Sequence, residues 1–383
     1  MAGHVRKLES GRYIARFPVG GRGRFRSRTF DRKRDAQGWL TSQTSRRDRG
    51  DWVDPSLASE SFAGVADAWL KSRRAVATST AARDESYFRN LILPYLGDYE
   101  LRHIGVEVLD DWVHDLDEVE GKSPATVRKA FQLAAAVLDR AVVLRKLPAN
   151  PARVGAAISL PAMSDAEMRF LTADEVHELA DAIEPRYRAL VLTAAFTGLR
   201  WGEAAGLRAK RLDLPAARLT VAEVLSEVRG ELSFKAPKTA ASRRTLALPS
   251  LLVEELRSHL AEWPAVGGGL VFTGPTGTPL RRTNFRRRVW EPAVEAAELG
   301  PLRFHDLRHT HASMLIAQGE HPKTIQMRLG HASISTTLDT YGHLMEGLDA
   351  AAAARLDASM KHSGSTEGRA PVLEMKARKP KNP

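Results

Sequence analysis

Four short stretches of the sequence combine cationic side chains with one hydroxyl group that could act as a nucleophile. They are TGLRWGE (197–203), KAPKTAASRRTLALP (235–249), FHDLRHTHAS (304–313) and LGHASISTTLDTYGHL (329–344). In the last stretch a tyrosine follows a histidine by ten residues, in a run rich in Ser and Thr. Together the stretches supply six candidates for one active site: Arg200, Lys238, His305, Arg308, His331 and Tyr341.

This set of side chains suits the transfer of a phosphoryl group to a protein hydroxyl. The non-bridging oxygens of a phosphodiester gain negative charge during attack, and the planar guanidiniums of Arg200 and Arg308 could bind them in place of magnesium. A tyrosine hydroxyl has a pKa near 10, so it needs nearby cations and a base that accepts its proton. A covalent phosphotyrosine would conserve the energy of the broken bond, so rejoining would require no cofactor.

Each stretch also has an ordinary structural explanation. Arg200 and Glu203 stand three residues apart and could form an ion pair on a helix surface, and we interpret Glu203 as orienting that helix. Lys238 lies in a turn between two predicted strands and could point into solvent. His309 and His311 suggest a metal site, but no carboxylate or further histidine stands at the spacing of a known zinc motif, so we predict no metal ligand.

The composition indicates a multidomain protein that binds a polyanion. The chain has 383 residues, with 43% hydrophobic and 27% charged, and its lack of cysteine excludes thiolate chemistry. Residues 1–50 contain 14 Lys/Arg and four Asp/Glu, and this difference of +10 accounts for most of the net charge of +11. Charge localised in this way is typical of nucleic-acid binding. With no apolar leader and no apolar stretch of membrane-spanning length, we expect a cytoplasmic protein without membrane contacts.

The basic first segment has the pattern of a small sheet. HVRKLE (4–9), GRYIARFPV (11–19) and GRGRFRSRTF (21–30) are predicted strands, and a short helix capped by Asp31 follows them. We expect this helix to cover one face of the sheet while the other face enters a DNA groove. Arginines occupy every second position of the third strand and should all project from that DNA-facing side: Arg22, Arg24, Arg26 and Arg28.

Two polar segments, 46–61 and 155–169, are predicted linkers. The residues between them have a helical pattern, clearest in a helix that Ser123 caps and Pro124 begins. A capping box at Thr172 opens a region of helices with predicted strands at 218–225, 231–236 and 243–249. We therefore predict a multidomain fold, mainly α with small β-sheets. Its parts are a basic three-stranded domain with one helix (1–55), a helical domain (62–155), a mixed α/β catalytic domain (168–360) and a disordered tail (361–383).

The four stretches also reproduce the motifs of a known family in that family's order. TGxRxxE, HxLRH, LGH and a tyrosine shortly after LGH all occur, with a lysine-bearing hairpin between the first two. Over about residues 62–345 the chain resembles the tyrosine recombinases of the phage-integrase family. The resemblance implies an integrase with an arm-binding domain at 1–55 and a helical, SAM-like core-binding domain before the catalytic domain.

The resemblance also implies how DNA would be cut. Arg200 and Arg308 would hold the scissile phosphate, and His331 would hydrogen-bond one of its oxygens. Tyr341 would attack the phosphorus, leaving a 3′-phosphotyrosine and a free 5′ hydroxyl.

Proton transfer and DNA contact involve further residues. Lys238, or alternatively Lys235 in the same hairpin region, would protonate the leaving oxygen, and His305 would assist proton transfer. The run RRTNFRRRVW (281–290) adds predicted contacts to the DNA backbone: Arg281, Arg282, Arg286, Arg287 and Arg288.

The implied partners are double-stranded DNA, at core-type and arm-type attachment sites, and other copies of the chain in a homotetramer that passes through a Holliday junction. An excisionase and a DNA-bending host factor are implied as well, in a bacterial cell. The alternatives are a Xer-like chromosome dimer resolvase, which usually lacks a basic arm domain, a type IB topoisomerase, and a non-catalytic DNA-binding regulator. The sequence leaves open the attachment sites, the kind of element and whether the C-terminal segment docks in cis or in trans.

Overall fold

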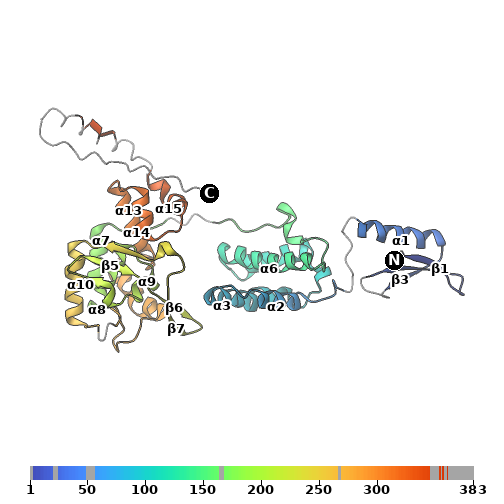
Figure 1. Ribbon diagram of the computed structural model, residues 1–383, viewed down its shortest axis with the longest axis horizontal. Helices are drawn as coiled ribbons and strands as arrows, with labels where there is room; N and C mark the ends of the chain where they lie inside the picture. Colours follow the sequence, from blue (N-terminus) through green and yellow to red (C-terminus); the bar gives the residue numbers. More distant parts are fainter. Residues whose placement is uncertain are drawn as a thin grey trace, which may run out of the picture. The chain divides into compact units, whose positions relative to one another are not determined.

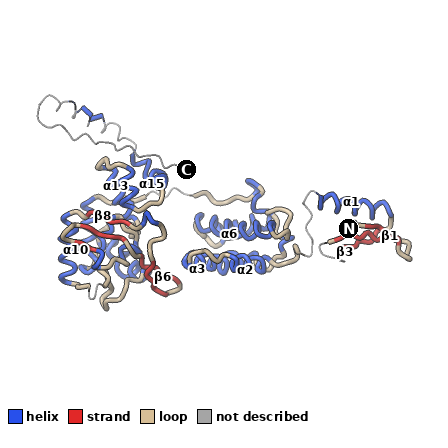
Figure 2. Tube along the Cα trace, viewed as in Figure 1, coloured by secondary structure: helices blue, strands red, loops and turns tan. Residues whose placement is uncertain are grey.

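The computed structural model describes residues 3–19, 25–48, 57–163, 168–265 and 269–345, together with residues 353, 354, 356, 357 and 360. The chain divides into two compact units, Met1–Ala166 and Glu167–Pro383. Helices dominate both units, and the described strands form three small sheets (Figure 2). No described helix is long and apolar enough to cross a membrane. The predicted fold class, multidomain and mainly helical with small sheets, is confirmed.

The first unit begins with a three-stranded antiparallel sheet in the order β1-β2-β3, followed by one helix. Its elements are β1 (His4–Lys7), β2 (Tyr13–Pro18), β3 (Phe25–Phe30) and α1 (Lys33–Asp48). Helix α1 lies along one face of the sheet (Figure 1), where Ala15 and Phe17 are fully buried. Asp31 forms an ion pair with Arg12 at 2.9 Å, and the helix begins two residues after it.

The register of this sheet corrects the predicted direction of the arginines. Residues directly opposite each other on antiparallel strands project from the same face. Arg26 lies opposite Phe17 and Arg28 opposite Ala15, so both arginines share the face that α1 covers, not the open face. The prediction placed helix and arginines on opposite faces because strand alternation alone does not show which face a helix will cover. The other two predicted residues, Arg22 and Arg24, lie outside the described residues.

The open face of the sheet carries two other arginines. Arg6 lies opposite Ile14, and Arg16 lies between His4 and Ser27, so these five residues share one face. Both arginine side chains are exposed, as is that of His4. The open face is therefore basic, but its arginines come from β1 and β2 and not from the third strand.

The rest of the first unit is a helical domain built around its longest helix, α6. Apolar residues of α6 recur at helical spacing and are buried, among them Val127, Ala134 and Leu138. Ser123 takes the N-cap position as predicted, but its hydroxyl pairs with that of Thr126 at 2.9 Å instead of capping a backbone N–H. The elements are α2 (Phe62–Ser72), α3 (Thr78–Tyr87), η1 (Phe88–Ile92), α4 (Leu93–Leu96), η2 (Leu101–His103), α5 (Val106–His114), η3 (Asp115–Val119), α6 (Pro124–Val143), η4 (Pro151–Arg153) and η5 (Gly155–Ala157).

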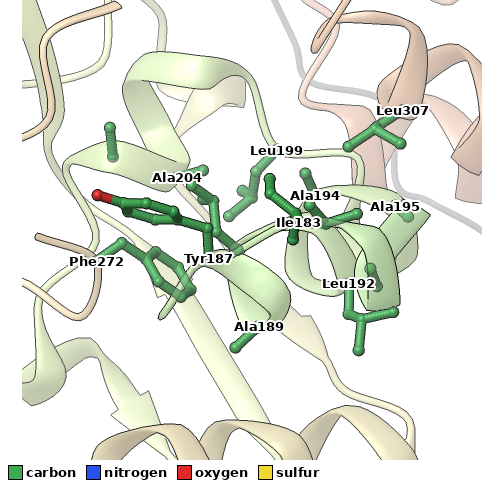
Figure 3. Close-up of a cluster of buried hydrophobic side chains, with 14 of the residues drawn as sticks. Ile183, Tyr187, Ala189, Leu192, Ala194, Ala195, Leu199, Ala204, Phe272 and Leu307 are labelled. Atoms are coloured by element: carbon green, nitrogen blue, oxygen red, sulfur yellow. The ribbon is translucent and has the colours of Figure 1, made fainter. Parts of the chain in front are cut away.

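The second unit opens with the predicted capping box, since Thr172 Oγ1 accepts from Glu175 N at 3.2 Å and Glu175 Oε2 accepts from Thr172 N at 2.7 Å. Helix α8 runs through its apolar core, to which it contributes Tyr187 and Leu192, and Phe272 joins the same cluster from a distant segment (Figure 3). Its helices up to residue 296 are α7 (Ala173–Ala182), α8 (Pro185–Thr197), α9 (Trp201–Ala205), η6 (Ala209–Arg211), η7 (Ala240–Ser242), α10 (Ser250–Glu262), α11 (Arg282–Phe285), η9 (Arg286–Trp290) and α12 (Glu291–Ala296).

The strands of the second unit form two sheets instead of one. A three-stranded sheet has the order β4-β5-β8, and a separate hairpin pairs β6 with β7. The predicted strand 218–225 is split between the two sheets, since β5 ends at Val221 and β6 begins at Val224. The backbone of Leu225 in β6 packs closely against Gly202 of α9, where a Cβ would lie 2.6 Å from Leu225 O. The strands are β4 (Leu212–Asp213), β5 (Arg218–Val221), β6 (Val224–Val228), β7 (Glu231–Lys235) and β8 (Arg244–Ala247).

A small cluster of helices follows α12 in the second unit. They are α13 (Asp306–Ala317), α14 (Pro322–Leu329), α15 (Ile334–Tyr341) and η10 (Gly342–Met345). Ala312, Ile325 and Leu329 form an apolar core of their own together with the tyrosine that ends α15. The predicted tail, 361–383, lies outside the described residues.

Candidate active site

The site is built around the C-terminal end of α14, where the LGH stretch ends the helix. Gly330 has a left-handed backbone with φ of 66°, and a Cβ there would lie 2.9 Å from Arg244 Nη1 and 3.1 Å from Ala241 O. Only glycine satisfies both the conformation and the close approach. Ending the helix at this point leaves its last carbonyl oxygens without helical partners, and these oxygens attract cations.

Two of the predicted arginines meet on one of these carbonyl oxygens. Leu329 O accepts hydrogen bonds from Arg308 Nη2 at 2.6 Å and from Arg200 Nη1 at 3.4 Å. Arg308, which is 2% exposed, also donates from Nη1 to Gly198 O at 2.6 Å. The side chain of Arg200 is 39% exposed, so Arg200 is the member of this arginine pair that faces solvent. The structure thus brings together two guanidiniums that lie 108 positions apart in the sequence (308 − 200).

A third guanidinium, from Arg244, completes the cluster and was not predicted. Its Nη1 and Nη2 donate to Glu203 at 3.2 and 3.0 Å, and its Nε donates to Arg328 O at 2.6 Å. Glu203, predicted to orient the helix of Arg200, is buried and accepts from both Arg244 and Arg200. No sequence signal distinguished Arg244 from its neighbour Arg243, because both stand at the start of the same predicted strand, 243–249.

The cluster has more positive than negative charge. Glu203 is the carboxylate that contacts it, against the guanidiniums of Arg200, Arg244 and Arg308. Burial, and next the charge of Arg200, lower the pKa of Arg308 to about 9. An anion placed at the exposed side of Arg200 would offset this repulsion, and the site has the character of a binding site for one phosphate group.

Two predicted histidines lie beside the cluster. His305 precedes the first residue of α13 and retains solvent contact. His331 follows Gly330, and its Nδ1 is hydrogen-bonded to Thr337 Oγ1 at 2.8 Å. Desolvation, reinforced by neighbouring cationic and imidazole groups, lowers the pKa of each ring to about 4. Both rings are therefore neutral at pH 7, and each can donate or accept a hydrogen bond.

Tyr341, the predicted nucleophile, is the last residue of α15 and is 1% exposed. Its hydroxyl lies 2.9 Å from Nδ1 of His309, a residue that the sequence analysis considered only as a metal ligand. Burial raises the pKa of Tyr341, while the charges of Arg308 and Arg200 act in the opposite direction. The phenol is thus within electrostatic range of both guanidiniums. Among the described residues, no group of three or more His, Asp or Glu side chains is arranged to hold a metal ion.

His311 supports the cluster from behind. Its Nδ1 lies 3.1 Å from Ala195 O, and its Nε2 accepts from Arg328 Nε at 3.2 Å, which requires the proton on Nδ1. Burial, followed by the charge of Arg328, lowers the pKa of His311 to about 3. His311 is therefore a neutral structural residue that fixes α13 and α14 against α8.

The structure does not choose between the two candidate lysines. Lys235 ends β7, and Lys238 lies in the loop between β7 and β8. Both side chains are exposed, and neither forms an ion pair with another described residue. Lys238 therefore stays a prediction.

The arginine run at 281–288 is only partly available for contacts. Arg281 donates to Glu227 Oε1 at 2.8 Å and to Gly230 O at 2.7 Å, which ties it to the β6–β7 hairpin. Arg286 pairs with Glu291 at 2.8 Å. The other three are exposed and remain predicted DNA contacts: Arg282, Arg287 and Arg288.

Comparison with known sequences identifies the family. The phage integrase family matches residues 169–347, its N-terminal domain residues 1–49 and its SAM-like N-terminal domain residues 61–116. The chain belongs to the phage integrase family, the site-specific tyrosine recombinases. The prophage phiRv2 integrase of Mycobacterium tuberculosis H37Rv is 28% identical over 362 residues, covering 92% of this chain and 94% of the relative.

Solved structures share the fold of this recombinase. The Tn1549 transposon integrase in complex with a circular intermediate DNA has a TM-score of 0.68 at 19% identity, covering 78% of this chain and all of that chain. A lambda integrase tetramer bound to a Holliday junction has a TM-score of 0.56 at 21% identity, covering 87% of this chain and 94% of that chain.

Protonation of His311 should make the second unit sensitive to acid. Because folding lowers the pKa of this histidine to about 3, the unfolded chain binds more protons below the ordinary value of 6.5. The contribution of His311 to the free energy of unfolding is therefore fully present above pH 6.5. It is lost as the pH decreases toward 3, at about 1.4 kcal/mol per pH unit. We expect His311→Asn to reduce this slope by that amount.

The slope is measured by urea unfolding at several pH values, through a fluorophore on a cysteine introduced at Leu251. This position is 50% exposed, and the chain has no other cysteine. Ile316→Val, also on α13, is the control, since it should cost about 1 kcal/mol without altering the slope. An unchanged slope in His311→Asn would show that this residue does not titrate as described.

Proposed function

We propose that this recombinase is the integrase of a phage or integrative element. It would cut double-stranded DNA at attachment sites and rejoin it through a 3′-phosphotyrosine intermediate. The observation that carries the proposal is the excess of guanidinium over carboxylate around Leu329 O, within electrostatic range of the Tyr341 phenol. A phosphodiester is an anion that the guanidiniums of such a site can bind and that the phenol can cleave.

The proposed reaction uses the predicted residues in two steps. Arg200 and Arg308 bind the non-bridging oxygens of the scissile phosphate. Loss of one hydrogen-bond donor to such a developing negative charge typically lowers kcat by about 10²–10³-fold. The oxygen of Tyr341 forms a bond to phosphorus as the bond to the 5′ oxygen breaks, and Lys238 gives that oxygen a proton. In the reverse direction a 5′ hydroxyl attacks the phosphotyrosine, so the number of phosphodiester bonds is conserved.

The neutral histidines would complete this site. His331, whose Nδ1 is occupied by Thr337, can present its Nε2 to a phosphate oxygen. His305 retains solvent contact at the entrance and would assist proton transfer there. Because both rings are neutral at pH 7, they would contribute hydrogen bonds without adding to the charge repulsion of the arginines.

Two further parts of the chain would grip DNA. The helical domain would bind core-type sites, and exposed arginines at 282–288 would contact the backbone. In the domain at 1–49 we propose that Arg6 and Arg16, on the open face of the sheet, contact arm-type sites in preference to Arg26 and Arg28. Phosphate contacts of this kind weaken as salt concentration rises.

We also propose the finer features of the assembly. The functional form would be a homotetramer that passes through a Holliday junction, as the tetrameric lambda integrase structure suggests for this chain. An excisionase and a DNA-bending host factor would set the direction of the reaction in the bacterial cytoplasm. The match of residues 1–49 to an integrase N-terminal domain favours this assignment over a Xer-like resolvase or a type IB topoisomerase.

The nucleophile can be tested directly, because residues 167–383 contain only two tyrosines, Tyr187 and Tyr341. With a nicked duplex carrying the element's own attachment site, the wild-type protein should form a covalent adduct visible in a denaturing gel. Tyr341→Phe should form none, whereas Tyr187→Phe should retain the adduct because Tyr187 packs in the apolar core. Absence of any adduct with wild-type protein on its true site would favour a non-catalytic regulator.

The proposed DNA-contacting face of the β1-β2-β3 sheet can be tested by reversing charges on each face. Arg6→Glu/Arg16→Glu should weaken binding to arm-site DNA strongly and reduce the slope of log K against log salt by about 0.9 for each lost phosphate contact. The matched pair, Arg26→Glu/Arg28→Glu, has the same change of charge on the helix-covered face and should lose less. Binding isotherms at several salt concentrations measure both, and a greater loss in the second pair would contradict the proposed face.

A further inference from the structure

The phenol of Tyr341 has one described hydrogen-bond partner, and it is none of the residues predicted to act in catalysis. His309 Nδ1 lies 2.9 Å from the phenol oxygen, and the two rings meet edge to face with centroids 5.7 Å apart. His309 follows Arg308 on α13, so the backbone that places a phosphate-binding guanidinium also places this imidazole. Its position is therefore fixed by the same helix.

The other histidines are less suited to the phenol. His331 Nδ1 is occupied by Thr337 Oγ1, and His305 contacts the ring of His309 edge to face, with centroids 5.1 Å apart, instead of contacting the phenol. His311 has both nitrogens engaged, with Ala195 O and Arg328 Nε. By geometry, His309 is the base next to the nucleophile.

We propose that His309 accepts the proton of Tyr341 as the phenol attacks the scissile phosphate. This inference rests on the proposed nucleophilic role of Tyr341. The phenol O–H bond breaks and its proton bonds to His309 Nδ1, while the phenol oxygen bonds to phosphorus and the bond to the 5′ oxygen breaks. In rejoining, the departing phenolate recovers that proton from His309.

The charges around His309 couple this transfer to DNA binding. Arg303 and Arg308 oppose its protonation, and Asp306 favours it, although Asp306 is itself held by Arg303 at 2.8 Å. Of the other titratable groups nearby, His305 caps the same helix, His331 follows α14, and the phenol itself comes from α15. His343 in η10 is exposed. Without DNA, burial keeps the proton on the phenol, because it raises the pKa of Tyr341 and lowers that of His309, although the charges of Arg308 and Arg200 lower the pKa of the phenol. A bound phosphate offsets the charge of Arg308, so the imidazole becomes a better base when substrate is present.

The test must separate deprotonation of the nucleophile from protonation of the leaving group. A substrate whose 5′-bridging oxygen is replaced by sulfur serves this purpose, because a thiolate leaves without a proton. We expect His309→Asn, which keeps an acceptor near the Nδ1 position but is not basic, to slow single-turnover adduct formation by about 10²–10⁴-fold on both the oxygen and the sulfur substrate. Lys238→Ala should lose activity on the oxygen substrate and recover it on the sulfur substrate.

The pH profile gives a readout that a purely structural role would not change. On the sulfur substrate the wild-type rate should fall with a single protonation at acidic pH, and this fall should persist in His305→Asn but vanish in His309→Asn. A gel shift with attachment-site DNA checks that each variant is folded. Added imidazole should partly restore His309→Gly, which provides a second measurement if the asparagine variant binds DNA poorly.

Other results would overturn the inference without touching the proposed function. A wild-type rate in His309→Asn, or a faster one, would mean that His309 is a spectator or a latch that holds the phenol back. Loss of the acidic fall in His305→Asn but not in His309→Asn would transfer the role to His305. By contrast, failure of the wild-type protein to form any Tyr341-dependent adduct would overturn the proposed function itself.

Discussion

The catalytic unit depends on an imbalance of charge at the C-terminal end of α14. Three guanidiniums, those of Arg200, Arg244 and Arg308, converge there, and one buried carboxylate, that of Glu203, contacts two of them. Removing the partner of a buried charge typically costs several kcal/mol, so Glu203 and the helix carbonyls are needed to hold the arginines together before substrate arrives. The charge that they leave unbalanced is what a phosphodiester would supply.

Several features of the chain follow from this constraint. Two glycines, at 198 and 330, end α8 and α14 in the left-handed conformation, and a Cβ on Gly198 would lie 2.7 Å from Leu329. These tight turns bring Gly198 O and Leu329 O within reach of Arg308. Burial, reinforced by neighbouring cationic and imidazole groups, lowers the pKa of His305 and that of His331 to about 4, which keeps further positive charge out of the site. Tyr341 is packed against this assembly by the small core of α13, α14 and α15.

Local patterns in the sequence predicted many of the elements, because each depends on short-range spacing. The capping box at Thr172 and the N-cap position of Ser123 are of this kind. The meeting of Arg200 with Arg308, which are 108 positions apart, was expected instead from the chemistry of the candidate residues and from the order of the family motifs. Other features depend on contacts between distant segments. The face carrying Arg26 and Arg28 depended on where α1 packed, Arg244 depended on the strand that brought it to Glu203, and the partner of Tyr341 depended on the approach of α15 to α13. No periodicity within one element contains that information.

The central claim is that the guanidinium cluster exists to bind the negative charge of the scissile phosphate. It is tested most directly by measuring single-turnover cleavage of an ordinary phosphodiester and of a neutral methylphosphonate, as separated diastereomers, by wild-type protein and Arg200→Ala. Arg200 is partly exposed, so its loss should leave the fold intact. The account predicts that Arg200→Ala cuts the phosphodiester about 10²–10³-fold more slowly than the wild-type protein does. For at least one methylphosphonate diastereomer, the variant should be less than about tenfold slower than the wild-type protein. An equal loss on charged and neutral substrates would contradict it.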